Sequence, residues 1–257
     1  MKIGLALRDF FFPPKCPGCY EIFKAQYGRD NEMCEACKRK WEVLRATVCA
    51  DCGEPFTNCK CAPKALERAG VSSLIKLVPY RQKRAVSNNT VLYIKRHRDA
   101  RVFAFLADQL AYEIERTVKR LGLRREDIAL CYSPRRRGAV AETGFDQARL
   151  LSLGVSKRTQ LPTIKALARV GKLSRAQKKL NAKGRSENVR GAFSLARGAD
   201  VKNKTVFLID DLVTTGSTMA ECARQLKRGG AALVIGVCVA FTEKETKNGV
   251  DKENAIC

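Results

Sequence analysis

The chain has 257 residues, of which 45% are hydrophobic and 29% charged, a composition typical of a folded protein with room for one α/β domain and a small appendage. No apolar run reaches the roughly 18–20 residues that span a bilayer, which excludes a helical membrane protein and leads us to expect a cytoplasmic one. The net charge of +23 predicts polyanionic partners such as nucleic acid or pyrophosphate.

The positive charge is concentrated in the middle of the chain. Residues 116–190 contain 20 Lys and Arg against 5 Asp and Glu, whereas residues 1–66 contain 11 against 8. For most charge runs the simpler explanation is a solvated face that keeps the protein soluble. An imbalance of this size over one segment favours an anion-binding surface instead.

Eight of the twelve cysteines lie between residues 16 and 61, mostly as Cys-x2-Cys pairs. A two-residue gap lets two thiolates on a tight turn reach one metal ion, and two such turns close a tetrahedral site. A disulfide framework would need an oxidising compartment, which nothing in the sequence indicates. Chain order suggests two metal sites, with an interleaved pairing left open: Cys16, Cys19, Cys34 and Cys37 in the first, and Cys49, Cys52, Cys59 and Cys61 in the second.

A site closed by four thiolates has no open coordination position, so we expect the metal to be structural zinc, with one ion per site and two in all. Metal binding would also explain how so small a segment folds with few large apolar side chains. Each zinc with four thiolates carries a net charge of −2, so the basic field belongs to the rest of the chain.

The segment after the cysteines reads as a connector at 62–70, a strand at 71–80, a short helix at 91–97 and a long helix at 102–121. The long helix places its apolar residues on one face, as a core helix does. The only histidine, His97, lies in a basic run and is expected to be a solvated surface residue rather than a catalytic one.

A second strand at 127–133 runs into a basic loop that contains Arg135, Arg136 and Arg137. A helical pattern opens at 143–147 and continues through Leu151. Residues 165–190 are polar, basic and weakly patterned, and we interpret them as a mobile loop or lid. Residues 191–195 form a predicted edge strand.

The most informative stretch is 205–218. Its first half is apolar without alternation, as in a strand covered on both faces. Two adjacent carboxylates follow, Asp210 and Asp211, and then a hydroxyl-rich loop before the next helical pattern: Thr214, Thr215, Gly216, Ser217 and Thr218. A last strand is predicted at 232–241, and the tail from residue 243 is polar.

This loop precedes a helix start, where unpaired N–H groups and the helix dipole favour an anion. Hydroxyls add hydrogen-bond donors, and Gly216 would let the backbone approach a bound group. A simple helix cap needs only one hydroxyl, so the pattern favours a phosphate site. Because carboxylates repel phosphate, Asp210 and Asp211 should face sugar hydroxyls, and together these features suggest a ribose 5-phosphate.

The strand, the Asp pair and the Thr-Thr-Gly-Ser-Thr loop resemble the phosphoribosyl-pyrophosphate (PRPP) loop of type I phosphoribosyltransferases. With the eight cysteines, Gly144-Phe145-Asp146-Gln147 and the spaced set from Gln177 to Phe193, the chain resembles the competence-associated ComF family. That resemblance implies an α/β fold in which a double zinc ribbon at 1–66 precedes a mostly parallel-sheet type I phosphoribosyltransferase-like domain at 67–257. The family's usual Arg-Gly-Phe-Asn-Gln has Thr143 in place of its arginine, and Arg135 to Arg137 could serve the pyrophosphate instead.

The resemblance implies two functions of different classes. The first is a phosphoribosyltransferase that binds PRPP with Mg²⁺, using residues 214–218 for the 5-phosphate, Asp210 and Asp211 for the ribose, and Arg135, Arg136 and Arg137 for the pyrophosphate. The second is a non-catalytic module that binds nucleotide or single-stranded DNA during DNA uptake, together with proteins of the competence machinery. Aromatic residues make up only 7%, so DNA contacts would be mostly to phosphate.

Overall fold

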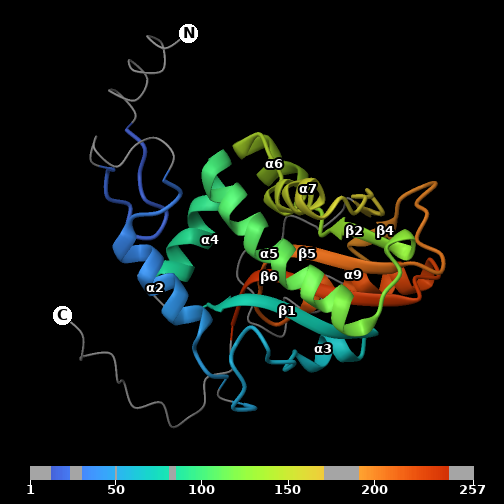
Figure 1. Ribbon diagram of the computed structural model, residues 1–257. Coiled ribbons are helices and arrows are strands. Elements are labelled where there is room, and N and C mark those ends of the chain that lie inside the picture. The colour runs from blue at the N-terminus through green and yellow to red at the C-terminus, as the bar shows by residue number, and fades with distance from the viewer. Residues whose placement is uncertain (1–12, 24–30, 50, 81–84, 171–190, 243–257) are drawn as a thin grey trace.

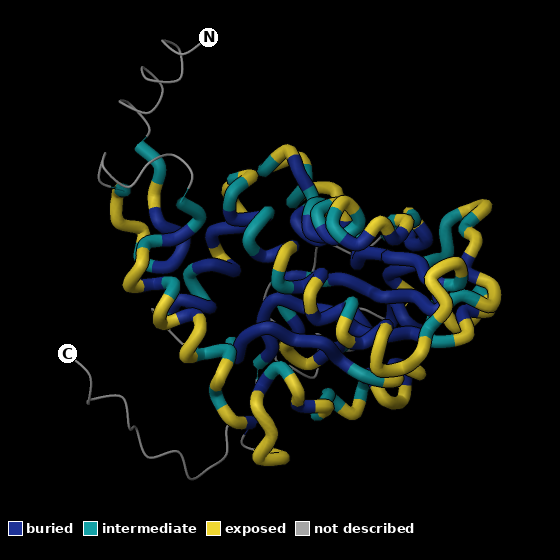
Figure 2. The backbone as a smooth tube through the Cα atoms, in the orientation of Figure 1, coloured by how far each residue is buried: buried dark blue, intermediate teal, exposed yellow. Residues whose placement is uncertain are grey.

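The computed structural model describes residues 13–23, 31–49, 51–80, 85–170 and 191–242. The predicted lid beyond residue 170 and the polar tail from residue 243 therefore lie outside the described residues. Figure 1 shows the arrangement of the elements, and Figure 2 shows that the central strands are buried while exposed residues lie in the connections and along the outer helices.

A four-stranded sheet forms the centre of the molecule, in the order β1-β6-β5-β2. All neighbouring pairs are parallel, which confirms the predicted parallel sheet. The strands are β1 (Val71–Pro79), β6 (Leu233–Phe241), β5 (Thr205–Val213) and β2 (Ile128–Tyr132). Because they are parallel, their carboxyl ends lie at one edge of the sheet, where open α/β folds bind ligands.

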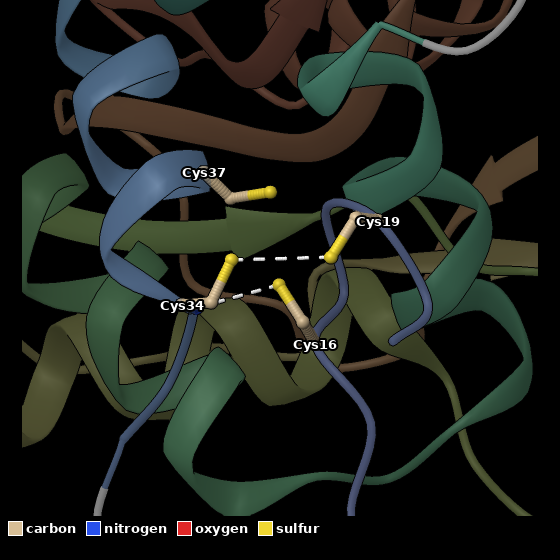
Figure 3. Close-up of side chains that lie close together, drawn as sticks. All are labelled: Cys16, Cys19, Cys34 and Cys37. Carbon is tan, nitrogen blue, oxygen red and sulfur yellow. Dashed lines mark hydrogen bonds between the residues drawn. The ribbon is translucent and has the colours of Figure 1, made fainter. Parts of the chain in front are cut away.

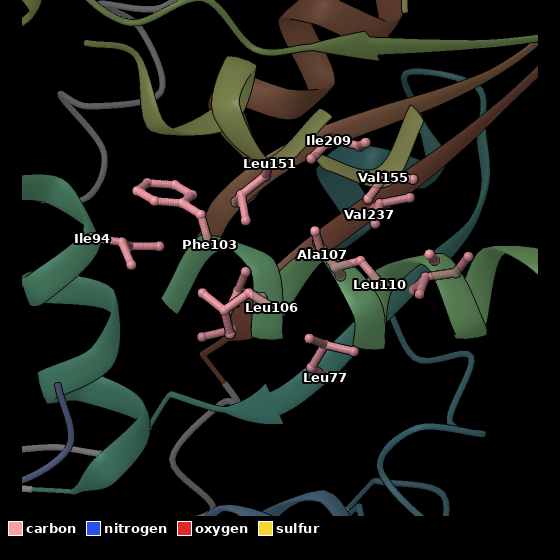
Figure 4. Close-up of a cluster of buried hydrophobic side chains, with 14 of the residues drawn as sticks. Leu77, Ile94, Phe103, Leu106, Ala107, Leu110, Leu151, Val155, Ile209 and Val237 are labelled. Carbon is pink, nitrogen blue, oxygen red and sulfur yellow. The ribbon is translucent and has the colours of Figure 1, made fainter. Parts of the chain in front are cut away.

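One face of the sheet is covered by α4 (Val86–Arg96), α5 (Ala100–Leu121) and α7 (Gln147–Thr159). Their apolar side chains meet those of the strands in one continuous core, part of which is drawn in Figure 4. The predicted helix at 102–121 is confirmed in α5. Its N-cap is Asp99, whose side chain accepts a hydrogen bond from the Arg101 backbone N–H, as a helix start requires.

The opposite face carries α9 (Ser217–Arg228), the short α3 (Lys64–Glu67) and a two-stranded antiparallel sheet of β3 (Leu167–Arg169) and β4 (Phe193–Leu195). The predicted edge strand at 191–195 therefore exists, but it pairs with β3 and not with the main sheet. The sequence did not predict β3, because a strand of three residues is too short to show the alternation of apolar and polar residues.

The cysteine-rich segment packs against the β1 side of the sheet through α2 (Glu35–Arg45), as Figure 1 shows. Trp41 of α2 is fully buried, and its Nε1–H donates to Gln109 Oε1 of α5 at 2.8 Å. Cys16 and Cys37 belong to the core beneath α5, whereas Phe56 belongs to the core beneath α9. The appendage thus shares both hydrophobic cores of the main domain.

Besides α3, which lies within the expected connector at 62–70, two helices of the main domain differ from the sequence prediction. Helix α4 begins at Val86, well before the expected residue 91, because tertiary contacts outweigh the weak helix propensity of its first residues. One such contact joins Asn89 Nδ2 to the Gly18 carbonyl at 2.7 Å. The other difference is that α6 (Arg137–Thr143) turns part of the predicted basic loop into a helix, so that α7 begins only at Gln147.

Strand β5 is longer than predicted. Its pairing with β6 continues past the expected end at Asp210, through Leu212 opposite Ala240 and Val213 opposite Phe241. The two aspartates therefore lie within the strand and not after it. Aspartate is unfavourable in a strand, so the local sequence does not predict that β5 continues. The strand continues because it pairs with β6. Within the described residues, none of the helices combines the length and apolar character that crossing a membrane requires.

The crossing of α5 and α7 gives a test of this packing. A Cβ atom at Gly154 would lie 2.8 Å from Ala107 Cβ, so Gly154→Leu should lower the free energy of unfolding by about 1–3 kcal/mol through overpacking. Gly138 of α6 has open space around it, and Gly138→Ala should instead stabilise by up to about 1 kcal/mol. Urea denaturation measures both; equal effects at the two glycines would contradict the described crossing.

Candidate functional site

The first cysteine group lies where the N-terminal segment meets α2. Figure 3 shows the four side chains converging on one point, with Cys19 Sγ and Cys34 Sγ 3.9 Å apart. Cys16 Sγ accepts hydrogen bonds from the backbone N–H groups of Gly18 and Cys34, both at 3.4 Å. Such donors favour the thiolate form that binds metal.

The second group follows the same geometry. Cys52 Sγ lies 3.5 Å from Cys59 Sγ, which also accepts a hydrogen bond from the Cys61 backbone N–H at 3.3 Å. The structure groups the eight cysteines in chain order and not in an interleaved way, and within each group all four sulfurs lie within 4.8 Å of one another. Zinc–sulfur bonds of about 2.3 Å place tetrahedral sulfurs about 3.8 Å apart, so both groups fit a structural zinc ion.

The hydroxyl loop joins β5 to α9, with Thr214 and Thr215 exposed and Gly216 buried. Gly216 has a φ of 75°, and a Cβ atom there would lie 3.0 Å from Leu66 Cγ of α3. Glycine is therefore required by backbone conformation and by packing, and not only by the approach of a ligand. Thr215 Oγ1 and Ser217 Oγ lie 2.9 Å apart at the helix start.

The first turn of α9 has N–H groups without intrahelical acceptors, as every helix has. The first backbone hydrogen bond of the helix runs from the Ala220 N–H to the Gly216 carbonyl oxygen, at 2.8 Å. The N–H groups before Ala220 belong to Ser217, Thr218 and Met219, next to the paired hydroxyls. Together with the helix dipole, they make this turn suitable for an anion.

The two aspartates are neighbours in the last part of β5, and the Asp211 backbone N–H donates to Asp210 Oδ1 at 2.9 Å. Asp211 is buried under α4 and α7, where its Oδ2 accepts from Gln147 Nε2 at 3.3 Å and pairs with Lys95 Nζ at 3.5 Å. Asp210 is less buried and belongs to the α9 side. Burial and the neighbouring charge of Asp211 raise the pKa of Asp210 well above its usual value, with Lys95 opposing this shift.

The arginine loop follows β2, which pairs directly with β5. The Arg135 backbone N–H donates to Asp146 Oδ2 at 2.8 Å, and its guanidinium donates to Thr143 Oγ1 at 2.9 Å. Arg136 and Arg137 are exposed at the start of α6. The structure thus brings the arginine loop and the hydroxyl loop to the same end of two adjacent strands.

Sequence reasoning missed three residues of this region. Lys95 and Gln147 hold Asp211, as described above; Gln147 is identified only as part of the family segment at 144–147, and no pattern predicts either contact. Arg169 of β3 stacks on the Phe193 ring at 4.8 Å. Burial and the charge of Arg136 lower its pKa, while Asp210 raises it, so Arg169 lies within electrostatic reach of both. His97 is exposed and stacks on Tyr93 at 4.4 Å, as expected for a surface residue.

Two family models match separate parts of the chain. The model of the double zinc ribbon domain matches residues 7–67, and that of the phosphoribosyl transferase domain matches residues 162–256. The DNA utilization protein YhgH of Salmonella typhimurium is 30% identical over 227 residues, which cover 82% of this chain and 90% of that protein. YhgH of Escherichia coli K12 is 26% identical over the same shares of the two chains.

Competence protein F of Haemophilus influenzae is 36% identical over 88 residues, which span 34% of this chain and only 38% of that protein. Among solved structures, purine phosphoribosyltransferase from Pyrococcus horikoshii has a TM-score of 0.34 at 15% identity, covering 53% of this chain and 74% of that one. The allosteric regulatory enzyme of purine biosynthesis has a TM-score of 0.36 at 16% identity, covering 58% and 30%.

The two cysteine groups predict two zinc ions per purified chain by elemental analysis. Cys19→Ser should leave about one, because three thiolates no longer close the first site, and Cys52→Ser should remove the other. Ser217→Ala, outside both groups, is the control and should keep the full content. One zinc in the unmodified chain, or loss of both from either single substitution, would contradict two separate sites.

Proposed function

The chain belongs to the family of the DNA utilization protein YhgH and competence protein F, and from this premise we propose that it binds PRPP with Mg²⁺ and acts as a phosphoribosyltransferase. PRPP has a phosphate at one end, a pyrophosphate at the other and two sugar hydroxyls between them. A ligand of this kind needs two anion-binding loops separated by hydrogen-bond acceptors.

The observation that carries the proposal is the placement of the two loops. The parallel pairing of β2 with β5 puts Tyr132 opposite Ile209, so the arginine loop and residues 210–218 begin side by side. One loop is cationic, and the other offers hydroxyls and helix N–H groups. The carboxylates lie in the last residues of β5, shortly before the hydroxyl loop, and this sequence of groups supports a ligand with the order of groups along PRPP.

The proposed roles follow from this geometry. The N–H groups and hydroxyls of residues 214–218 hold the 5-phosphate. Asp210 accepts from the ribose hydroxyls, whereas Asp211 is buried and already bound to Lys95 and Gln147. Arg135, Arg136 and Arg137 face the pyrophosphate, and Arg169 adds positive charge beside Asp210.

Mg²⁺ prefers phosphate oxygens and water and needs no dedicated protein cage; when bound, it would neutralise charge on the pyrophosphate. In the transfer, the bond between ribose C1 and the pyrophosphate oxygen breaks and a bond from C1 to the acceptor forms. The chain's part is to position the sugar and to stabilise negative charge on the leaving group. The arginine loop is suited to that second task.

Asp210→Asn tests this function. The amide keeps the size of the side chain but loses the charge-assisted hydrogen bonds to the ribose, so affinity for PRPP with Mg²⁺ should fall by about 10-fold or more. Asp200→Asn is the matched control, because Asp200 is exposed and forms an ion pair with Lys204, four residues later in the chain. Calorimetry gives both affinities. Absence of binding heat with the unmodified chain would refute PRPP binding itself.

A second function, binding of single-stranded DNA, is favoured by a different surface. A hollow of about 410 Å³ lies between the second cysteine group and α5, and three cations surround it. Its lining consists of Thr57, Asn58, Arg116, Thr117, Lys119 and Arg120. Cations around a hollow fit backbone phosphates, and the relatives' name, DNA utilization protein, agrees with such a ligand. Competence proteins would then be the partners of the bound state.

The salt dependence of DNA binding separates the two functions. Replacing Arg116, Lys119 and Arg120 together by glutamine should weaken binding of a single-stranded oligonucleotide and reduce the slope of log affinity against log salt by about 2. The control replaces the exposed Arg197, Lys202 and Arg228 in the same way and should change the slope less.

Replacing Arg135, Arg136 and Arg137 should also weaken DNA binding under this function, while Asp210→Asn should not. Equal slopes for the hollow and control variants would exclude the hollow as the DNA site.

A further inference from the structure

A buried lysine lies between the second cysteine group and the central sheet. Lys76 of β1 is only 1% exposed, and its Nζ donates to the Cys61 carbonyl oxygen at 2.8 Å. The same ammonium lies 4.9 Å from the centre of the Phe56 ring and 4.5 Å from that of Phe241. It is therefore enclosed by two aromatic rings and the chain that holds the cysteines.

An ammonium group out of water needs a compensating negative charge. The described ion pairs join other cations to carboxylates, and Lys76 takes part in none of them. One carbonyl and two ring faces supply partial compensation only. Packing alone therefore does not explain why position 76 is a lysine, since a methionine would fill the same space without the cost of burying a charge.

We propose that Lys76 is the counter-cation of the second cysteine site and thereby helps that site to retain its zinc. Zinc with the thiolates of Cys49, Cys52, Cys59 and Cys61 has a net charge of −2, and Cys61 is the residue that Lys76 contacts. The attraction acts on the loaded site, because only there are all four sulfurs negative. This inference depends on zinc binding and not on PRPP binding.

The rival counter-charge is Asp210. In the sheet, Lys76 and Asp210 both lie opposite Cys238, so two strand spacings of about 4.8 Å separate their backbones. Both side chains belong to the α9 side of the sheet. The contact at Cys61 is direct, whereas Asp210 lies across an intervening strand, and attraction falls with distance. The cysteine site is therefore the nearer partner.

The position of Lys76 also connects the zinc site to the hydroxyl loop. Phe56, Leu66 and Phe241 belong to one buried core, and Leu66 lies directly beneath Gly216. Zinc held near Lys76 would keep this core in place under residues 214–218. Lys76 is thus a positioning residue and not one that touches a substrate.

The test measures zinc release from the full-length, zinc-loaded chain to a chromophoric chelator. Lys76→Met should speed the release of one of the two zinc ions by about tenfold or more, because removing one partner of a buried charge pair is strongly unfavourable. Lys76→Arg keeps the charge and should release zinc at nearly the rate of the unmodified chain. The same pair of variants in a Cys19→Ser background assigns the faster release to the second site.

Thermal unfolding supplies a second readout. Zinc should raise the melting temperature of the unmodified chain more than that of Lys76→Met, because the lysine favours the loaded state and is an unpaired buried cation in the metal-free state. If Lys76→Met does not fold, Lys76→Gln is measured instead, since its amide can still donate to Cys61 without a charge. The expected result for glutamine is again faster release from one site.

Two results would overturn the proposal. In the first, Lys76→Met lowers the melting temperature equally with and without zinc and leaves both release rates unchanged, so that the side chain only fills the core. In the second, Asp210→Asn destabilises the unmodified chain but not the Lys76→Met chain, while zinc release is unaffected by Lys76→Met. That pattern would assign the counter-charge to Asp210.

Discussion

The parallel pairing of β2 with β5 is the constraint on which the candidate site depends. Neither loop has the chemistry of a sugar-phosphate site alone, since one offers cations and the other hydroxyls and helix N–H groups. Their strands are adjacent, and the Ser133 backbone N–H donates to the Ile209 carbonyl at 3.0 Å just where β2 ends. This bond holds the start of the arginine loop against the start of the acidic pair. The spacing of the proposed anion sites is therefore set by backbone hydrogen bonds rather than by flexible side chains.

The cysteine-rich segment is a structural part of the same unit. Its first half contributes Trp41 and two cysteines to the core beneath α5, and its second half contributes Phe56 to the core beneath α9. Residues of the cysteine-rich segment consequently cover both faces of the sheet at the β1 edge, and metal binding would hold that segment in its fold. An edge strand covered in this way is protected from pairing with other chains. Loss of zinc should therefore disturb the sheet as well as the appendage.

The acidic pair is asymmetric, and this asymmetry has a chemical consequence. Asp211 lies in a buried network with Lys95 and Gln147, so its charge is already balanced by the protein. Asp210 is less buried and lies close to the positive charge of Arg169. Its raised pKa is what burial near a second carboxylate produces. A ligand that donates hydrogen bonds would relieve this unfavourable burial, whereas an anion would increase it.

The sequence by itself determined the features that depend on neighbouring residues: the apolar strands, the long amphipathic helix, the hydroxyl loop before α9 and the paired cysteines. It also identified the family. Only the tertiary structure decided which four cysteines form each group, that β5 continues through Asp210 to Val213, and that α4 begins at Val86. It also decided that Lys95 meets Asp211 and that Lys76 meets Cys61. Periodicity and spacing report the preferences of one segment. These other features arise when segments far apart in the chain pack together, and the free energy of that packing exceeds the local preferences that a sequence pattern records.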